Sequence, residues 1–295
     1  MLNLLDFFIT ASFSYANYLW YIITNPFAKE NYFYLLIALS ILVWCLEMIF
    51  PWRKNQALIR KGFYLDTFFI FFNFFLFNLV FFIAFSNLSE LYFHKLLLTL
   101  GIPINGIISL NHFPIVFQIL IYFILADFLQ WAIHRLLHTN RFLWRFHKVH
   151  HSVTEMNFAA HFRFHFVEHF IYKGGLYLLL SWLINFELKY VFYIHALNIL
   201  IGHLNHSNLN LDYGIFKYVF NNPKLHIWHH SKTFPKRFAK GANFAISLSV
   251  WDYIFKTVYM PSDGKLIKLG FENIEKYPQT FVKLMQEPFK AKKNL

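Results

Sequence analysis

The chain has 295 residues, of which 57% are apolar and 14% are charged, and its mean hydropathy is +0.40. Because an average soluble domain has about 25% charged residues, this chain has too few charges to cover a water-facing globule. The same composition excludes a disordered chain, and a single cysteine excludes a disulfide-stabilised secreted scaffold. We therefore predict an all-α, polytopic membrane protein.

Positive charge is in excess, since 27 Lys and Arg stand against 15 Asp and Glu, for a net charge of +12. In a soluble protein this excess would suggest nucleic-acid binding. In a membrane protein it is better explained by basic cytosolic loops and by attraction to anionic lipid headgroups. We therefore expect a membrane partner and no nucleic acid.

Apolar stretches recur through the first two thirds of the chain, and a helix needs about 20 such residues to cross a bilayer. We expect membrane segments, in chain order, at residues 4–23, 32–50, 63–85, 114–133, 166–185 and 188–204. The stretch 91–110 is also apolar, but it is interrupted by Gly101, Pro103 and Gly106. We interpret it as a re-entrant or interfacial piece, because glycine and proline break helices.

The orientation follows from the loop between the second and third segments. It carries four basic residues and no acidic one, namely Arg53, Lys54, Arg60 and Lys61. The positive-inside rule places this loop in the cytosol, and segment 114–133 then returns to the same side. We expect the polar, basic residues that follow, and those beyond residue 205, to form a histidine-rich helical cap on the cytosolic face.

Histidine is the most unusual feature of the chain. Ten of the 16 histidines fall in four clusters: His134 and His138; His147, His150 and His151; His203 and His206; and His226, His229 and His230. Positions i, i+3 and i+4 share one face of a helix, so each cluster would point its imidazoles the same way. The pattern H-x-x-H-H occurs twice, which indicates metal ligation rather than a run of polar interfacial side chains.

These imidazoles predict two metal ions, because ten ligands are too many for one ion. Imidazole binds zinc, copper, iron and nickel, and a ligand set without thiolates argues against structural zinc and iron–sulfur clusters. The clusters lie at the ends of predicted membrane segments, which suits a substrate with a long apolar tail. A competing hypothesis is a membrane transporter or sensor for a divalent metal, although transport would place ligands along a path through the bilayer.

Five motifs follow one another between about residues 125 and 257. They are D-F-L-Q-W-A-I-H-R-L-L-H (127–138), L-W-R-F-H-K-V-H-H-S (143–152), H-S-N-L (206–209), N-P-K-L-H-I-W-H-H-S (222–231) and S-V-W-D-Y-I-F (249–255). In this order they resemble the fatty acid hydroxylase/sterol desaturase superfamily of membrane-bound, histidine-rich di-iron oxygenases. The resemblance divides the chain into N-terminal membrane segments (1–112), a catalytic domain (113–260) and a basic C-terminal tail (261–295).

The resemblance implies two iron ions, O₂ as cosubstrate, and electrons from a separate electron-transfer protein. It implies hydroxylation, or desaturation, of a C–H bond in a membrane lipid. The family's metal ligands map onto nine of the clustered histidines, and His203 is a tenth candidate. The predicted metal ligands are therefore His134, His138, His147, His150, His151, His203, His206, His226, His229 and His230.

Two acidic residues are candidates for a catalytic role. Asp127 lies two helical turns before His134, where it could accept the free N–H of a ligating imidazole. Alternatively, it marks the boundary with water. Glu168 lies near the start of a predicted membrane segment, where a charge is costly unless it is used or paired. An ion pair between Glu168 and Arg163 is as good an explanation as catalysis.

Two further candidates complete the predicted site. His161, His165 and His169 repeat every four residues, and we keep His165 as a residue that could lie just outside the metal ligands. Trp251 and Asp252 are expected to pack the cap, although Asp252 could instead hold a ligating histidine. The candidate catalytic residues are thus Asp127, His165, Glu168 and Asp252.

Overall fold

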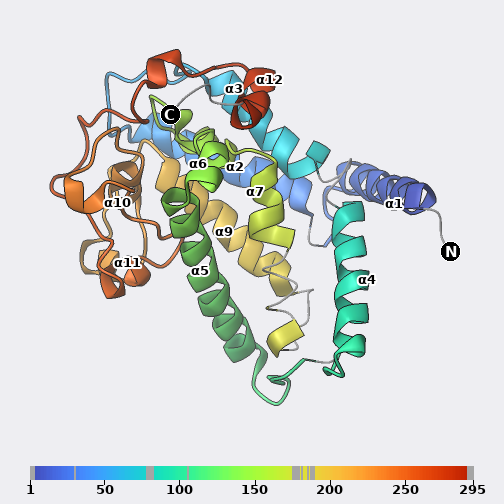
Figure 1. The fold of residues 1–295 in the computed structure, drawn as a ribbon. Helices are drawn as coiled ribbons and strands as arrows, with labels where there is room; N and C mark the ends of the chain where they lie inside the picture. Colours follow the sequence, from blue (N-terminus) through green and yellow to red (C-terminus); the bar gives the residue numbers. More distant parts are fainter. Residues whose placement is uncertain are drawn as a thin grey trace.

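The computed structural model describes residues 4–290 apart from residues 30, 78–82, 105, 175–179, 181, 185 and 187–189. Across that part of the chain the structure is helical, with two isolated bridges and no β-strand, which confirms the predicted all-α fold. The α-helices, shown in Figure 1, are α1 (Leu4–Thr24), α2 (Tyr32–Ile49), α3 (Phe63–Phe71), α4 (Ile83–Thr99), α5 (Ile115–Thr139), α6 (Arg141–His147), α7 (Val167–His169), α9 (Val191–His206), α10 (Pro223–His229), α11 (Val250–Ile254) and α12 (Phe281–Gln286).

Two helices of the described chain are long and apolar enough to cross a membrane. They are α2, with 18 residues, and α5, with 25, and they match the predicted segments 32–50 and 114–133. In its N-terminal half α5 exposes Val116, Phe117 and Leu120, apolar side chains suited to lipid. Together with the composition, these helices support a membrane protein.

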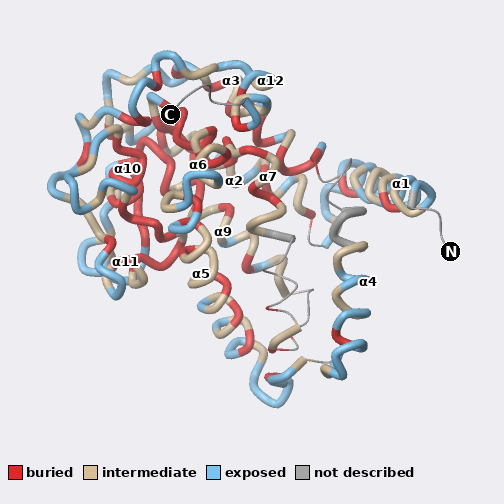
Figure 2. The backbone as a smooth tube through the Cα atoms, viewed as in Figure 1, coloured by how far each residue is buried: buried red, intermediate tan, exposed pale blue. Residues whose placement is uncertain are grey.

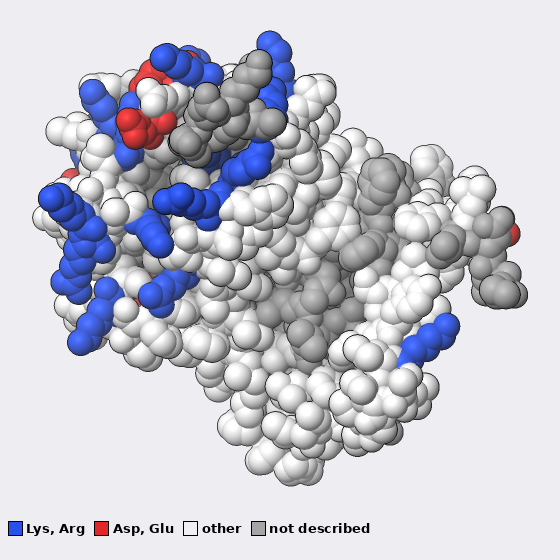
Figure 3. All heavy atoms as spheres, in the orientation of Figure 1, with Lys and Arg blue, Asp and Glu red and all other residues white. Residues whose placement is uncertain are grey.

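Charged side chains are unevenly distributed over the molecule. In Figure 3, Lys and Arg gather over the end that carries α6, α10 and α11, whereas the part built by α4 and the N-terminal half of α5 is largely free of them. This polarity fits a protein with one end in lipid and the other in water. The histidine-rich cap is thus present, while its cytosolic orientation stays a prediction.

The third predicted segment, 63–85, is not a single element in the described residues. Helix α3 continues as a π-helix over Phe72–Leu76, and α4 begins at Ile83 and runs to Thr99. The boundary predicted between segments 63–85 and 91–110 is therefore wrong, because α4 runs unbroken from the end of the first into the first half of the second. The chain leaves the helix where expected, at Gly101, which has a left-handed φ of 68°.

The predicted segments after residue 165 match only in part. Helix α7 is a single turn that passes into a π-helix over Phe170–Gly174, and α9 begins at Val191. The boundary expected between segments 166–185 and 188–204 falls largely on residues outside the described part of the chain.

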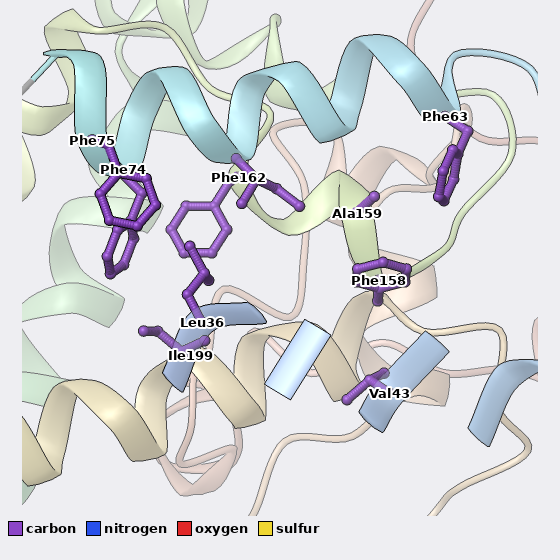
Figure 4. Packing of buried hydrophobic residues seen from close by; sticks show 10 residues of the cluster. Leu36, Val43, Phe63, Phe74, Phe75, Phe158, Ala159, Phe162 and Ile199 are labelled. Carbon is purple, nitrogen blue, oxygen red and sulfur yellow. The ribbon is translucent and has the colours of Figure 1, made fainter. Parts of the chain in front are cut away.

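An apolar core joins the membrane helices to the cap. In Figure 4, the ring of Phe162 faces Leu36 of α2 and Ile199 of α9, with Phe74 of the π-helix packed beside it. Phe158, from the same 3₁₀-helix as Phe162, packs against the other end of α2. Figure 2 shows that buried residues concentrate where α6, α9 and α10 meet, which is where the histidines lie.

A buried ionic network ties α3 to the segment of the second histidine cluster. Asp66 is fully buried and accepts hydrogen bonds from Arg60 and Arg163. The Arg163 Nη1–Asp66 Oδ1 distance is 2.9 Å, and Arg163 Nη2 lies 2.8 Å from Ser152 Oγ. Because Ser152 directly follows His150 and His151, this network positions those ligands.

We predict that Asp66→Asn destabilises the protein, because two buried guanidinium groups lose their anionic partner. Breaking a buried ion pair costs about 3–5 kcal/mol of the free energy of unfolding. The measurement is the midpoint of thermal unfolding in detergent, followed by tryptophan fluorescence. Asp6→Asn, at an exposed position of α1, is the control and should leave the midpoint unchanged. Equal midpoints for the two variants would argue against the network.

Candidate metal centre

The clustered histidines are carried by helix ends that converge from five parts of the chain. The last turns of α5 carry one pair, and α6 and the following 3₁₀-helix carry the first triplet. The end of α9 carries another pair, and α10 with its C-terminal cap carries the second triplet. Short helices suit this task, because each presents neighbouring imidazoles on one face.

The local sequence explains why two of these helices begin where they do. The side chain of Asn140 accepts hydrogen bonds from Phe142 N and Leu143 N, which caps α6. The side chain of Asn222 accepts from Leu225 N, and Pro223 occupies the first turn of α10. Asparagine at the N-cap and proline just after it are favoured helix starts. The caps therefore fix where each triplet begins.

Nine of the ten predicted ligands gather in two groups. Within each group one nitrogen atom of every histidine lies within 4.8 Å of those of the others, and all nine side chains are buried. The groups touch, since the rings of His151 and His230 stack with their centroids 4.4 Å apart. The first group is His134, His138, His147, His151 and His229, and the second is His150, His206, His226 and His230.

The outer nitrogens of several ligands are held by backbone carbonyls. His134 Nδ1 lies 2.7 Å from Phe244 O, His229 Nδ1 2.9 Å from Ala242 O, and His206 Nδ1 2.7 Å from Gly202 O. A carbonyl oxygen only accepts hydrogen bonds, so each Nδ1 carries the proton and donates. Each Nε2 is thereby left with a free lone pair that points into the group.

These lone pairs face one another, and this arrangement shows whether the residues could hold a metal ion. His134 Nε2 lies 3.1 Å from His147 Nε2, and His147 Nδ1 donates to the Glu168 carboxylate at 2.7 Å. Neither Nε2 then has a proton to share. His229 Nε2 is buried and has no hydrogen-bond partner. Converging buried acceptors without donors repel each other, and a cation among them satisfies them all, so the residues fit a metal ion.

Burial also keeps these imidazoles uncharged. It lowers the pKa of His229 to about 3. Burial likewise lowers the pKa of His150 well below its ordinary value, and the neighbouring His206 lowers it further. Neutral imidazole is the form that binds metal ions, so proton competition is weak at neutral pH.

A cavity of about 160 Å³ lies against both groups. His147 of the first group and His150 of the second line its wall. Polar side chains such as Gln130 and Asn198 also contribute, but most of the lining surface is apolar and includes Phe162, Phe164 and Ile199. Its lining is mostly apolar, so the cavity suits a hydrocarbon chain rather than a polar solute.

Comparison with known proteins agrees with this geometry. Residues 119–257 match the model of the family described as fatty acid hydroxylase. This segment belongs to that family. The resemblance of the five motifs is thereby confirmed. No solved structure matches the chain.

Curated relatives of this hydroxylase segment act on lipids. The ornithine lipid hydroxylase OlsE of Rhizobium tropici is 31% identical over 183 residues, which are 62% of this chain and 53% of the relative. Alkylglycerol monooxygenase of Xenopus tropicalis is 25% identical over 151 residues, 49% of this chain and 31% of the relative. The human alkylglycerol monooxygenase is 28% identical over 141 residues, which are 46% of this chain and 29% of the relative. The matches span about half of these relatives or less.

Glu168 is the predicted catalytic residue that the structure places beside the clustered histidines. Its Oε2 accepts from His147 Nδ1, and its Oε1 accepts from His165 N at 3.2 Å. The alternative pairing of Glu168 with Arg163 is wrong, because Arg163 pairs with Asp66. Glu168 therefore orients a histidine of the first group.

The two predicted aspartates hold loops rather than imidazoles. Asp127 accepts from Ser247 N at 2.9 Å, from Leu248 N at 3.0 Å and from Trp251 Nε1 at 2.9 Å, and none of these donors is a histidine. Asp252 accepts from Phe244 N at 3.0 Å. Because Phe244 O accepts from His134, Asp252 supports a ligand through the backbone.

His165 and His203 lie outside both groups. His165 Nε2 is 2.9 Å from Met285 O, so this side chain ties the site to the C-terminal helix α12. His203 Nε2 is 3.1 Å from Ser40 Oγ, and its Nδ1 is 3.3 Å from His161 Nδ1. Because the pattern H-x-x-H put His203 and His206 on one face, the sequence could not show that only His206 reaches the second group.

His161 belongs to the four-residue repeat in which only His165 is a predicted site residue, yet it is His161 that lies against the second group. Its ring stacks on His206 with centroids 5.4 Å apart, and it lines the cavity. It occupies space that a side chain at position 202 would take, since a Cβ on Gly202 would lie 2.1 Å from His161 Nε2. In the sequence, Gly202 is the signal of this contact. It can be recognised only when the segment of His161 is known to pack against α9.

We predict that Gly202→Ala destabilises the protein by about 1–3 kcal/mol, the usual cost of overpacking a filled interior. The double variant Gly202→Ala/His161→Ala removes the clashing ring and should recover the stability of His161→Ala alone. Thermal unfolding of the four proteins in detergent measures the coupling between the positions. Strictly additive losses would show that the two residues do not compete for space.

Proposed function

We propose that this protein is a membrane-bound lipid hydroxylase with an iron ion in each of its two histidine groups. The observation that carries the proposal is the convergence of nine buried imidazoles beside an apolar cavity. The family match and the lipid-oxidising relatives support the same reaction class. Imidazole accepts iron, and the absence of thiolate from both groups disfavours a structural zinc site.

Each part of the chain has a defined task in this proposal. Irons held by the two groups would supply the oxidising chemistry, using O₂ and electrons from a separate redox protein to convert a lipid C–H bond to an alcohol or, by a second hydrogen removal, to a double bond. Glu168 holds the proton of His147 Nδ1 and keeps that ring in one tautomer. Phe162, Phe164 and Ile199 would exclude water and hold one carbon of the chain near the ligands.

The substrate is proposed to be a membrane lipid that enters from the bilayer. The relatives are named for ornithine lipid and alkylglycerol, two membrane-type lipids with different polar parts. The apolar cavity accounts for binding of the part of a lipid that such molecules share, which is a hydrocarbon chain.

The electron donor is proposed to dock on the basic end of the molecule. In Figure 3, Lys and Arg gather over the end that carries α6 and α10, the helices of the two histidine triplets. A positive surface attracts an acidic redox protein and accelerates its association. By the positive-inside rule the same surface faces the cytosol, where such donors are reduced.

The competing function is transport or sensing of a divalent metal. A transport path needs ligands spaced through the membrane, whereas these imidazoles close into two groups at one end of α5. Vesicles that contain the protein should therefore take up neither zinc nor ferrous iron. Uptake above that of empty vesicles would favour the transporter.

We predict that the purified protein carries two irons per chain and that each group holds one. His229→Ala should lower the iron content of the first group and His226→Ala that of the second, each to about one iron per chain, because both residues belong to closed ligand sets. His203→Ala is the matched control, since this buried histidine lies outside both groups, and it should retain both irons. Mass spectrometry of metals in the purified proteins gives the ratio, and two irons in all three variants would contradict the assignment.

We predict that cells expressing the protein accumulate a lipid that is heavier by one oxygen atom, or lighter by two hydrogen atoms. His150→Ala should abolish this product, because it removes a ligand of the second group. Mass spectrometry of total lipids, with an empty vector and with His112→Ala as controls, measures the change. His112 lies before α5, away from both groups. Full product with His150→Ala would refute the proposed reaction.

A further inference from the structure

An exposed apolar surface lies on the cap, apart from the metal centre. The 3₁₀-helix Gly214–Tyr218 has the sequence G-I-F-K-Y, and none of its residues is buried. Ile215 is 77% exposed and Phe216 61%, and the exposed side chains continue through Tyr218, Val219 and Phe220. We call residues 213–220 the aromatic segment. Five large, exposed apolar side chains within six residues are a strong sign of an interaction site.

The backbone of the aromatic segment is held in place, so its exposure is not that of a loose loop. Ser249 Oγ donates to Lys217 O at 2.6 Å, and Asn221 N donates to Ser247 O at 2.8 Å. The ring of Tyr218 packs on Tyr253 with centroids 5.0 Å apart. The fold thus fixes the backbone against residues 247–253 and directs the apolar side chains outward.

The neighbouring helix α11 extends this surface toward the membrane helix α5. Ile254 is 58% exposed and Phe255 42%. Phe255 stacks on Trp131 of α5 with centroids 4.4 Å apart. Trp131 lies one turn before His134, at the end of the apolar part of α5, where this candidate membrane helix would leave the lipid. Because Tyr218 of the aromatic segment packs on Tyr253 of α11, the segment lies next to the point at which α5 would leave the lipid.

A groove connects the aromatic segment to α9. It is lined by Ile201 of α9, by Phe216 and Phe220, and by Ser247. Ser247 Oγ donates to Asn198 Oδ1, and Asn198 lines the cavity of the metal centre. The hydrogen-bonded pair Asn198–Ser247 thus links the lining of the groove to the lining of the cavity.

We propose that the aromatic segment and its groove bind the bilayer itself, with a lipid acyl chain in the groove. Lys217 lies over the ring of Tyr218 at 5.6 Å, and the exposed Lys256 follows Phe255. Aromatic rings flanked by lysines are the composition of a membrane interface, where the rings enter the headgroup region and the ammonium groups meet lipid phosphates. Continuity with the lipid-facing part of α5 favours this occupant over a second copy or another protein.

The test is fluorescence quenching by brominated lipid. In a Cys45→Ser background, which removes the single native cysteine, Phe216→Cys is labelled with bimane and placed as one copy per nanodisc of phosphatidylcholine. Discs brominated along the acyl chains should remove most of the bimane emission. Leu266→Cys, at a position that is 93% exposed in a loop bearing Lys265 and Lys268, is the matched control and should keep its emission.

Two results would overturn the proposal. In one, the label at position 216 is as open to a water-soluble quencher as the label at position 266 and insensitive to bromine. In the other, the label is shielded from water but still insensitive to bromine, which would assign the surface to protein. Ile215→Cys repeats the measurement at a second position, and unchanged iron content and unfolding midpoint confirm that each labelled variant is folded.

Discussion

The site depends on imidazole lone pairs that the fold forces to face one another. Backbone carbonyls and Glu168 take the protons of the outer nitrogens, which leaves the inner nitrogens of His134 and His147 as acceptors 3.1 Å apart. In a buried setting neither water nor protonation relieves this repulsion at low cost. The protein is therefore arranged for a cation before any cation arrives, and the surrounding contacts hold that arrangement.

The buried acidic residues supply much of this support, and they do so away from the ligands. Asp66 binds two arginines, one of which reaches Ser152 beside the first triplet. Asp252 holds the backbone whose carbonyl orients His134, and Asp127 holds the adjoining turn. A carboxylate that satisfies several backbone N–H groups fixes a loop more strictly than apolar packing does. The positions of the histidines are thus fixed by hydrogen bonds to acidic residues that lie just outside the two groups.

The architecture also connects the part of the molecule suited to lipid with the part suited to water. Helix α5 begins with side chains suited to lipid and ends with two histidines, so one helix carries the chain from the bilayer to the metal centre. The apolar cavity beside both groups and the groove of the aromatic segment are linked through the Asn198–Ser247 pair. A lipid oxidised at such a site would need to leave the bilayer by only a short distance.

The sequence by itself indicated the all-α class, the two membrane-length helices, the family and the ten clustered histidines, of which nine gather in the structure. It could do so because composition and i, i+3, i+4 spacing are local properties. Only the tertiary structure decided how the histidines divide into two groups, since His147 and His150 lie three residues apart yet face different partners. It also moved His203 out of the site, brought His161 over Gly202, and turned Asp127 and Asp252 toward loops. Those outcomes depend on contacts between segments far apart in the chain, and no spacing along one segment encodes which distant group will meet it.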